Sequence, residues 1–205
     1  MGEGMSGGIV GVLLAAGAGT RLGGAVPKPL VPFRGRPLAS WPLAALRAGG
    51  LEEVVVVLGA EADAVAGGME LGGDAEVVRC DEWAEGLSAS LRAGVQAAAG
   101  RGAAAVVIVL ADQPLLSGEA VARVVAARAP GEADAIRATY AGVPGHPTVL
   151  ESSTFAAVAG LRGDAGAREL LRDPSTRVHL VPCEGLGRPD DVDTPEMLAR
   201  LQAAR

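Results

Sequence analysis

The chain has 205 residues, a formal net charge of −6 and a pI near 5.0, and 49% of its residues are hydrophobic. This length is typical of one α/β domain with a sizeable core, and the acidic balance argues against a surface that binds nucleic acid. Aromatic residues make up only 2% of the chain, so a row of aromatic rings that stacks on bases is excluded and the core must consist of Ala, Val and Leu.

Nothing near the N-terminus predicts export or membrane insertion. Residues 1–7 are Gly-rich without apolar periodicity, and we expect a disordered tail there, followed by a single domain over residues 8–205. The longest apolar run, Ala103 to Ala111, is too short to cross a bilayer core of about 30 Å. We therefore expect a cytoplasmic protein with no membrane partner, in which Cys80 and Cys183 stay reduced.

Apolar runs alternate along the chain with segments of helical pattern. Predicted strands are Gly8–Leu14, Glu53–Leu58, Ala75–Val78, Ala104–Ala111, Ala133–Ala138 and Arg177–Val181. Predicted helices are Pro37–Ala48, Leu87–Ala99, Ser117–Arg128, Asp164–Arg172 and Thr194 to about Ala204, with Ser117, Asp164 and Thr194 as N-caps. The alternation predicts an α/β fold of three layers, with a mostly parallel central sheet and helices on both faces.

One segment interrupts this alternation. Tyr140–Leu150 contains two glycines and two prolines and is predicted to form a hairpin or an extended loop. We expect it to belong to an acceptor-binding part of the domain that covers about residues 139–175.

The first predicted strand runs into a loop of small residues that suits a phosphate group. Gly17, Ala18 and Gly19 leave the backbone N–H groups open to an anion, and Arg21 and Lys28 add positive charge. Ligands of parallel α/β sheets bind at the carboxyl ends of the strands, where this loop begins. The predicted nucleotide-binding residues of this segment are Leu14, Ala15, Ala16, Gly17, Ala18, Gly19, Thr20, Arg21 and Lys28.

Two common phosphate-binding motifs do not fit this loop. A Walker motif requires a Gly-Lys pair followed by Ser or Thr, which the chain lacks. A dinucleotide fingerprint requires a third Gly where Leu22 stands, and Pro27 and Pro29 would stop the helix that must follow.

The segment Val12 to Leu30 instead resembles the nucleotidyltransferase superfamily, whose loop reads close to L-A-A-G-x-G-x-R-(M/L)-G and is followed by K-P-L. Further motifs resemble one branch, the molybdenum-cofactor cytidylyltransferase-like proteins among the MobA-like NTP transferases: E-G-L-S-A-S-L at 85–91, L-A-D-Q-P-L at 110–115, G-V-P-G-H-P at 142–147, G-D-A-G-A-R at 163–168 and D-V-D-T-P-E at 191–196. The resemblance implies a Rossmann-like nucleotidyltransferase fold.

Carboxylates follow the predicted fourth strand and precede the last helix. A carboxylate directly after an apolar strand, as at Asp112, is costly to bury without a cation, and Asp191 and Asp193 could bring a second carboxylate to the same ion. Such oxygen ligands suit Mg²⁺, and the resemblance assigns Asp112 and the 191/193 pair to metal binding. Turn capping by Asp112 and electrostatic stabilisation of a helix N-terminus by Asp193 are the alternatives.

Other candidate binding residues lie at helix starts and in Gly-rich turns. Ser88 and Ser90 could cap a helix or contact the nucleotide, and the resemblance favours Ser90. His146 and Arg168 stand in motifs that the resemblance places on the acceptor side. A structural His is equally compatible with the sequence, and for Arg168 a last-turn or surface charge is the safer interpretation. Trp83, like Trp41, is predicted to be a packing residue.

The resemblance implies a Mg²⁺-dependent enzyme that transfers CMP from CTP to the phosphate of molybdenum-molybdopterin and releases pyrophosphate. Arg21, Lys28 and Asp112 are then the catalytic residues, and a recipient molybdoenzyme is a possible partner. A GTP-using guanylyltransferase, a transferase for a sugar or polyol phosphate, and a non-catalytic module that delivers the cofactor are the alternatives. Ala16 and the Asp pair at 191 and 193 argue against the guanylyltransferases, which tend to have Gly and Asn there.

Overall fold

A computed structural model describes residues 7–19, 22, 26–72 and 75–203 of the chain. Its strands are β1 Ile9–Ala15, β2 Pro32–Phe33, β3 Arg36–Pro37, β4 Val54–Leu58, β5 Ala75–Arg79, β6 Ala105–Leu110, β7 Ala135–Tyr140, β8 Val143–Glu151 and β9 Val178–Pro182. Its α-helices are α1 Ser40–Ala48, α2 Ala62–Gly68, α3 Leu87–Gly100, α4 Gly118–Ala126, α5 Phe155–Gly160 and α6 Pro195–Ala203. Short 3₁₀ helices cover Lys28–Leu30, Trp83–Glu85, Ser152–Thr154, Gly163–Arg168 and Leu170–Arg172.

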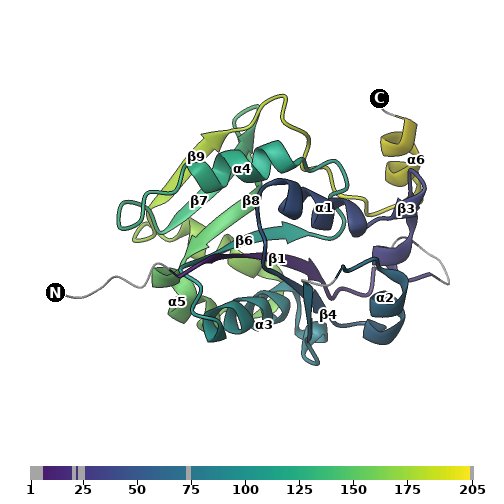
Figure 1. Cartoon of the computed structure of the whole chain (residues 1–205), viewed down its shortest axis with the longest axis horizontal. Helices are drawn as coiled ribbons and strands as arrows, with labels where there is room; N and C mark the ends of the chain where they lie inside the picture. The colour runs from purple at the N-terminus through teal and green to yellow at the C-terminus, as the bar shows by residue number, and fades with distance from the viewer. Residues whose placement is uncertain (1–6, 20–21, 23–25, 73–74, 204–205) are drawn as a thin grey trace.

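Seven strands form one sheet in the order β5-β4-β1-β6-β8-β7-β9 (Figure 1). β8 pairs antiparallel with both of its neighbours, and all other pairs in this sheet are parallel. The mostly parallel sheet confirms the predicted fold class. All six predicted strands are present within one or two residues of their predicted ends.

Two apolar cores cover the two faces of the sheet. Alternate residues of β1 show the division, since Leu13 packs with α1 and α4 whereas Val12 packs with α3 and α5. A central strand buried on both faces has no polar side to display, which explains why β4 reads as an unbroken V-V-V-V-L. The layers are visible in Figure 1, with α1 and α4 on one side of the sheet and α3 and α5 on the other.

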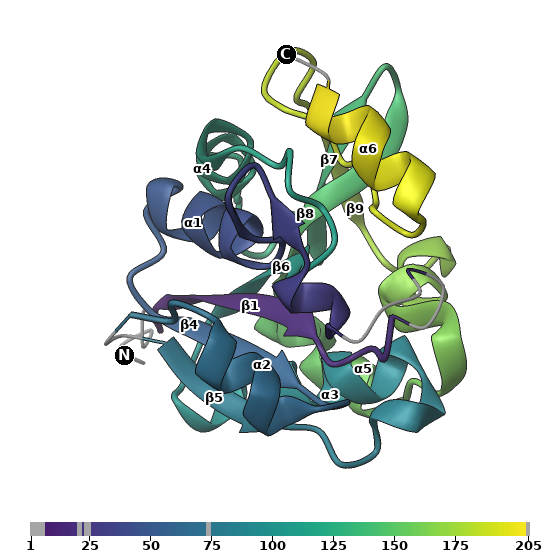
Figure 2. The same ribbon diagram turned by 90° about the vertical axis from the view of Figure 1, so that its right-hand side faces the viewer.

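A third, smaller core joins the end of the chain to its beginning. Phe33 and Leu38, from the β2–β3 hairpin region, pack with Val192 and with Leu201 of α6. The hairpin and α6 therefore lie at the same end of the molecule, where the carboxyl ends of β1 and β6 also lie (Figures 1 and 2). This packing brings the segment before α6 to the edge at which ligands of parallel sheets bind.

The predicted hairpin or extended loop at 140–150 is the turn between β7 and β8 together with most of β8. Ala141 and Gly142 both have positive φ, of 50° and 77°, as tight hairpin turns require. The register between the two strands shifts, because Arg137 pairs with Thr148 whereas Thr139 pairs with Pro144. Residues 145–147 therefore bulge out of regular pairing.

One predicted helix is wrong. The segment predicted as a helix from Asp164 to Arg172 forms two 3₁₀ turns, and Gly166 interrupts the first with φ 55° and ψ −134°. No residue of an α-helix adopts that conformation, so the segment turns sharply. Ser117 and Thr194 cap their helices as predicted, accepting hydrogen bonds from Ala120 N and Met197 N.

The remaining expectations concern the chain ends and membranes. Residues 1–6 of the predicted tail lie outside the part of the chain that the structure describes. In the described part, no helix has the length and apolar character needed to span a bilayer.

The close packing of α3 on the sheet generates a prediction. A Cβ at Gly94 would lie 2.6 Å from Cγ1 of Val12 and 3.0 Å from Cγ2 of Val57, in the middle of the core, whereas a Cβ at Gly100 meets nothing within 4 Å. Gly94→Ala is expected to lower the free energy of unfolding by about 1–3 kcal/mol through overpacking. Gly100→Ala in the same helix should raise it by about 0.5–1 kcal/mol, since Ala is the better helix former. Urea denaturation of both variants checks this, and an unaffected Gly94→Ala protein would contradict the close approach of α3.

Candidate functional site

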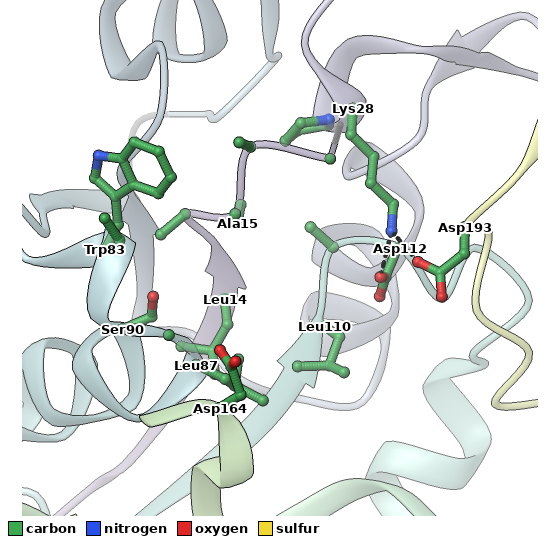
Figure 3. A pocket seen from close by; sticks show the side chains of 18 residues that line it. Leu14, Ala15, Lys28, Trp83, Leu87, Ser90, Leu110, Asp112, Asp164 and Asp193 are labelled. Atoms are coloured by element: carbon green, nitrogen blue, oxygen red, sulfur yellow. Dashed lines mark hydrogen bonds and ion pairs between the residues drawn. The ribbon is translucent and has the colours of Figure 1, made fainter. Parts of the chain in front are cut away.

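A cavity of about 420 Å³ opens at the carboxyl ends of β1 and β6 (Figure 3). One side is formed by the loop after β1, another by the start of α3, and a third by residues that follow β6 and precede α6. Its lining residues are Leu14, Ala15, Ala16, Gly17, Ala18, Gly19, Lys28, Pro29, Trp83, Ala84, Gly86, Leu87, Ser90, Leu110, Ala111, Asp112, Asp164 and Asp193. Most of the predicted nucleotide-binding residues thus share one cavity.

A lysine held between two carboxylates lies at one end of this cavity. Lys28 Nζ donates hydrogen bonds to Asp112 Oδ2 at 2.7 Å and to Asp193 Oδ1 at 2.8 Å. Lys28 is the only lysine in the sequence, whereas arginine is common. An ammonium group donates three hydrogen bonds from one atom, which lets it contact separate oxygens in several directions.

The charge of Lys28 is secured by its partners. Burial alone would lower the pKa of Lys28, but the Asp112 carboxylate and the Asp193 carboxylate more than offset this, so the pKa is raised. The ammonium group therefore stays protonated at neutral pH. The Lys28 side chain is 13% exposed, so solvent screens these ion pairs less than it screens pairs at the surface.

Two backbone features place the carboxylates. Asp112 lies two residues after the end of β6, and Val192 N donates a hydrogen bond of 2.9 Å to Asp112 O, which ties the segment before α6 to the end of this strand. Val192 is itself fully buried in the third core. Burial of Val192 and its hydrogen bond to Asp112 O hold the backbone next to Asp193, which places the Asp193 side chain within reach of Lys28.

The glycine loop packs directly on the lysine stem. Gly19 has a φ of 59°, and a Cβ there would lie 2.2 Å from the Cβ of Lys28. Only glycine fits this position, because any side chain would collide with Lys28 in a strained backbone conformation. Thr20 and Arg21, also predicted to bind nucleotide, lie outside the described residues.

The opposite end of the cavity is formed by Trp83 and Ser90 (Figure 3). Trp83 is partly buried and lines the cavity, so the prediction that it only packs the interior was incomplete. Ser88 does not line the cavity. Its buried hydroxyl donates a hydrogen bond of 3.1 Å to Arg162 O, so the structure does not bring this predicted nucleotide-binding residue to the cavity with Ser90.

A second cavity, of about 330 Å³, adjoins the first, since Leu14, Leu87 and Leu110 line both. It contains the two predicted acceptor-side residues, His146 and Arg168. Its other lining residues are Leu91, Ile108, Gln113, Arg137, Val143, Pro144, Gly145, Thr148, Ala165, Gly166, Ala167, Leu171, Pro189 and Asp191. Arg137 and Gln113 are polar residues of this cavity that the sequence analysis did not single out.

The two aspartates of the 191/193 pair have different partners and line different cavities. Asp191 lines the second cavity and accepts a hydrogen bond of 2.8 Å from Gln113 Nε2, whereas Asp193 pairs with Lys28 in the first. Burial, followed by the Asp112 and Asp193 charges, raises the pKa of Asp191. Within the described residues, no group of three or more Asp, Glu, His or Cys side chains is arranged to hold a metal ion. Fewer than the three predicted aspartates would therefore coordinate a metal ion bound here.

Comparison with known proteins gives consistent matches. The model of the MobA-like NTP transferase domain matches residues 11–179. Nicotine blue oxidoreductase of Paenarthrobacter nicotinovorans is 40% identical over 199 residues, which cover 94% of this chain and 96% of that protein. Purine catabolism protein PucB of Bacillus subtilis strain 168 is 33% identical, over 92% of this chain and 93% of its own.

Among solved structures, Rv0371c of Mycobacterium tuberculosis H37Rv superposes with a TM-score of 0.84 at 30% identity, over 97% of this chain and 100% of that one. A complex of Rv0371c with manganese gives a TM-score of 0.77 at 29% identity, with the same coverage. The matching domain model, the relatives that align along nearly their whole length and the shared fold lead to one conclusion: the chain belongs to the family of MobA-like NTP transferase domains.

Proposed function

We propose that this protein transfers a nucleoside monophosphate from a nucleoside triphosphate to a phosphate group of an acceptor. The observation that carries the proposal is the Lys28 ammonium between Asp112 and Asp193, in a cavity that also contains the small-residue loop. An acceptor phosphate oxygen attacks the α-phosphorus, the bond from this phosphorus to the oxygen that bridges to the β-phosphorus breaks, and pyrophosphate leaves. Such chemistry requires positioning and charge stabilisation more than a protein nucleophile.

The layout of the first cavity suggests how the triphosphate lies. The phosphates belong at the charged end with Lys28 and the backbone of the 15–20 loop, while the nucleoside extends toward Trp83 and Ser90. Lys28 would offset negative charge around the α-phosphoryl group, and Arg21 would bind the β- and γ-phosphates. A compact ammonium can move between carboxylate and phosphate oxygens as the charge shifts.

The carboxylates are suited to a divalent metal ion. Asp112 Oδ1 is buried and accepts no hydrogen bond from the described residues, and Asp193 lies within reach of the same Lys28 ammonium. Mg²⁺ commonly takes one or two carboxylates and completes its shell with water and substrate phosphates. Asp112 and Asp193 would hold it, with Asp191 as an outer neighbour, and the bound ion would supply charge stabilisation to the triphosphate. The manganese complex of Rv0371c supports a divalent ion in a protein of this fold.

The second cavity is the proposed acceptor site, with His146 and Arg168 as binding residues. It adjoins the first cavity along three shared leucines, so an acceptor could place its phosphate next to the triphosphate. We take CTP and the phosphate of molybdenum-molybdopterin as the first choice of substrates, because the motifs at 142–147 and 163–168 resemble those of the cytidylyltransferase branch. Delivery of the product to a molybdoenzyme would follow, and the whole reaction would take place in the cytoplasm.

The name of one relative, nicotine blue oxidoreductase, favours a second candidate, a redox activity. This candidate and the non-catalytic delivery module both predict that no pyrophosphate is released. The same experiment therefore separates the transferase from both of these candidates.

The reaction is tested by giving the purified protein each of the four nucleoside triphosphates with Mg²⁺ and molybdenum-loaded molybdopterin. Pyrophosphate and the dinucleotide product should both appear, with CTP at least tenfold faster than GTP. Faster reaction with GTP than with CTP would contradict the assignment of CTP as the nucleotide substrate. Reaction with sugar or polyol phosphates alone would contradict the assignment of molybdopterin as the acceptor. Binding without pyrophosphate release would reject the transferase.

Lys28→Met keeps most of the unbranched side chain and removes the ammonium group with its charge. It is expected to lower kcat/KM for the triphosphate by at least 100-fold, because loss of one preorganised charge contact in such a site has effects of 10²–10³-fold. Lys28→Arg should retain part of the activity. The matched control is Arg47→Met, which removes an exposed cation on α1 whose guanidinium donates a hydrogen bond to Leu71 O. Full activity of Lys28→Met would contradict the proposed role.

The pKa of Lys28 can be measured alone, since ¹³Cε-lysine gives a single resonance from a chain with one lysine. Its titration midpoint in the folded protein should lie above that in urea. Asp112→Asn should lower the midpoint, because burial lowers the pKa of Lys28 and one of the two carboxylates that offset this effect is removed. Since the folded pKa is raised, the stability contributed by the ion pairs is complete below the unfolded pKa and is lost as pH rises through the folded pKa.

The control for this titration is Asp190→Asn, since Asp190 pairs with Arg188 instead. It should leave the midpoint unchanged. A midpoint that Asp112→Asn does not move would show that the ammonium is not held by this carboxylate in solution.

A further inference from the structure

The sheet places an arginine on the floor of the second cavity. Ile108 of β6 pairs with Thr148 of β8, and Thr148 pairs with Arg137 of β7. Directly paired residues point to the same face of a sheet, so these three side chains form one row across it. All three line the second cavity.

Arg137 lacks the partners that a half-buried arginine normally has. Its guanidinium donates two long hydrogen bonds of 3.4 Å, to Gly145 O and Pro144 O, and no acidic side chain among the described residues pairs with it. A guanidinium has five N–H donors in a planar fork. Several donors therefore stay available inside a cavity.

The neighbours of Arg137 add positive charge. Burial lowers the pKa of Arg137, and the charges of Arg168 and Arg172 lower it further. His146, beside it, has a pKa lowered to about 4 by burial and by Arg137, and it is therefore neutral at pH 7. The repulsion of the Arg137 guanidinium by the charges of Arg168 and Arg172 is unfavourable, and a bound anion would relieve it.

A second, independent feature of this cavity points to a ligand. Gln113 is a buried residue, 4% exposed, and its Nε2 donates hydrogen bonds to two acceptors, Asp191 Oδ1 and Pro189 O. These two contacts fix the orientation of the amide and leave Oε1 buried without a hydrogen bond from the described residues. A buried acceptor without a hydrogen bond lowers the stability of the folded protein, so a donor from a ligand is expected there.

Arg137 is too far from the reaction centre to share a phosphate with it. Two strand spacings of about 4.8 Å and a run of four residues at about 3.3 Å separate Arg137 from Asp112, which places the Cα atoms on the order of 15 Å apart. Arg137 lines only the second cavity, and Lys28 and Asp112 line only the first. An anion at Arg137 is therefore a different group from the phosphate that attacks.

We propose that Arg137 and Gln113 form a specificity site that recognises an acceptor by a second anionic group and by an N–H or O–H donor. Arg137, with Arg168, binds the anion, and Gln113 Oε1 accepts the hydrogen bond. Apolar side chains, Leu14, Leu91 and Ile108 among them, line the cavity beside these polar groups. They favour an acceptor with an apolar body that carries two anionic groups at a distance. This assignment rests on the proposed function for the identity of the acceptor, but the anion site exists independently of it.

The first test is direct binding of inorganic phosphate and, separately, acetate to the protein without nucleotide. The side-chain ¹⁵N signals of Arg137 and Gln113 should shift saturably with one or both anions. Arg137→Met should abolish the shift at Gln113, and Arg168→Met should raise the apparent Kd at least threefold. Arg123→Met, an exposed arginine on α4 that donates to Pro182 O, is the control and should change nothing. Shifts that do not saturate with either anion would overturn the site, whatever the transferase assay shows.

The second test separates recognition from a structural role. With the substrates that release pyrophosphate, Arg137→Met should raise KM for the acceptor at least tenfold and leave kcat within twofold, with Arg137→Lys intermediate. Its urea midpoint should equal or exceed that of the wild type, because an unpaired half-buried charge is removed. A lowered midpoint together with unchanged phosphate binding would mean that Arg137 only supports the β7–β8 turn. If Arg137→Met abolished anion binding but left KM for the acceptor unchanged, only the assignment of this site to the acceptor would be rejected.

Discussion

The ion pairs of Lys28 with Asp112 and Asp193 are the interaction on which the first cavity depends. They join three segments that are far apart in the chain: the turn after the glycine loop, the end of β6 and the segment before α6. Two aspartates at this spacing would repel each other without the cation, and a partly buried ammonium would tend to lose its proton without the aspartates. Each of the three charged groups therefore offsets the electrostatic cost of burying the others, and the ion pairs form without a bound ligand.

Much of the fold was predictable because parallel strands that are buried on both faces must be apolar throughout. β4 and β6 read as continuous runs of Val, Ile, Leu and Ala, and their positions in the chain predict the layers. β8 was harder to recognise because two prolines and a bulge interrupt it, although it lies between β6 and β7 in the middle of the sheet. Proline is rare in central strands, so composition alone favours a loop. The helix predicted at 164–172 fails for a different reason. Helical propensity is local, whereas Gly166 adopts a positive φ in close contact with Leu87, where a Cβ would lie 2.8 Å from Leu87 Cδ2.

The convergence of Lys28, Asp112 and Asp193 could be predicted from topology, because each lies at a strand end or a helix start on the same edge of the sheet. Ser88 and Ser90 show the limit of such reasoning. They are two residues apart at one helix start, yet one faces the cavity and the other bonds to Arg162. Motif spacing places a helix near a ligand but does not specify which of its side chains faces the cavity.

Arg137 and Gln113 carried weaker signals that were still present in the sequence. An arginine inside the apolar strand A-I-R-A-T-Y is unusual, and only the three-dimensional pairing with Thr148 and Ile108 shows that it points to a cavity. The bulge at 145–147 contributes to this cavity in two ways. It brings His146 to the wall of the second cavity, and its Gly145 O accepts a hydrogen bond from the Arg137 guanidinium. The bulge that made β8 hard to recognise from the sequence thus contributes Gly145 and His146 to the wall of the second cavity.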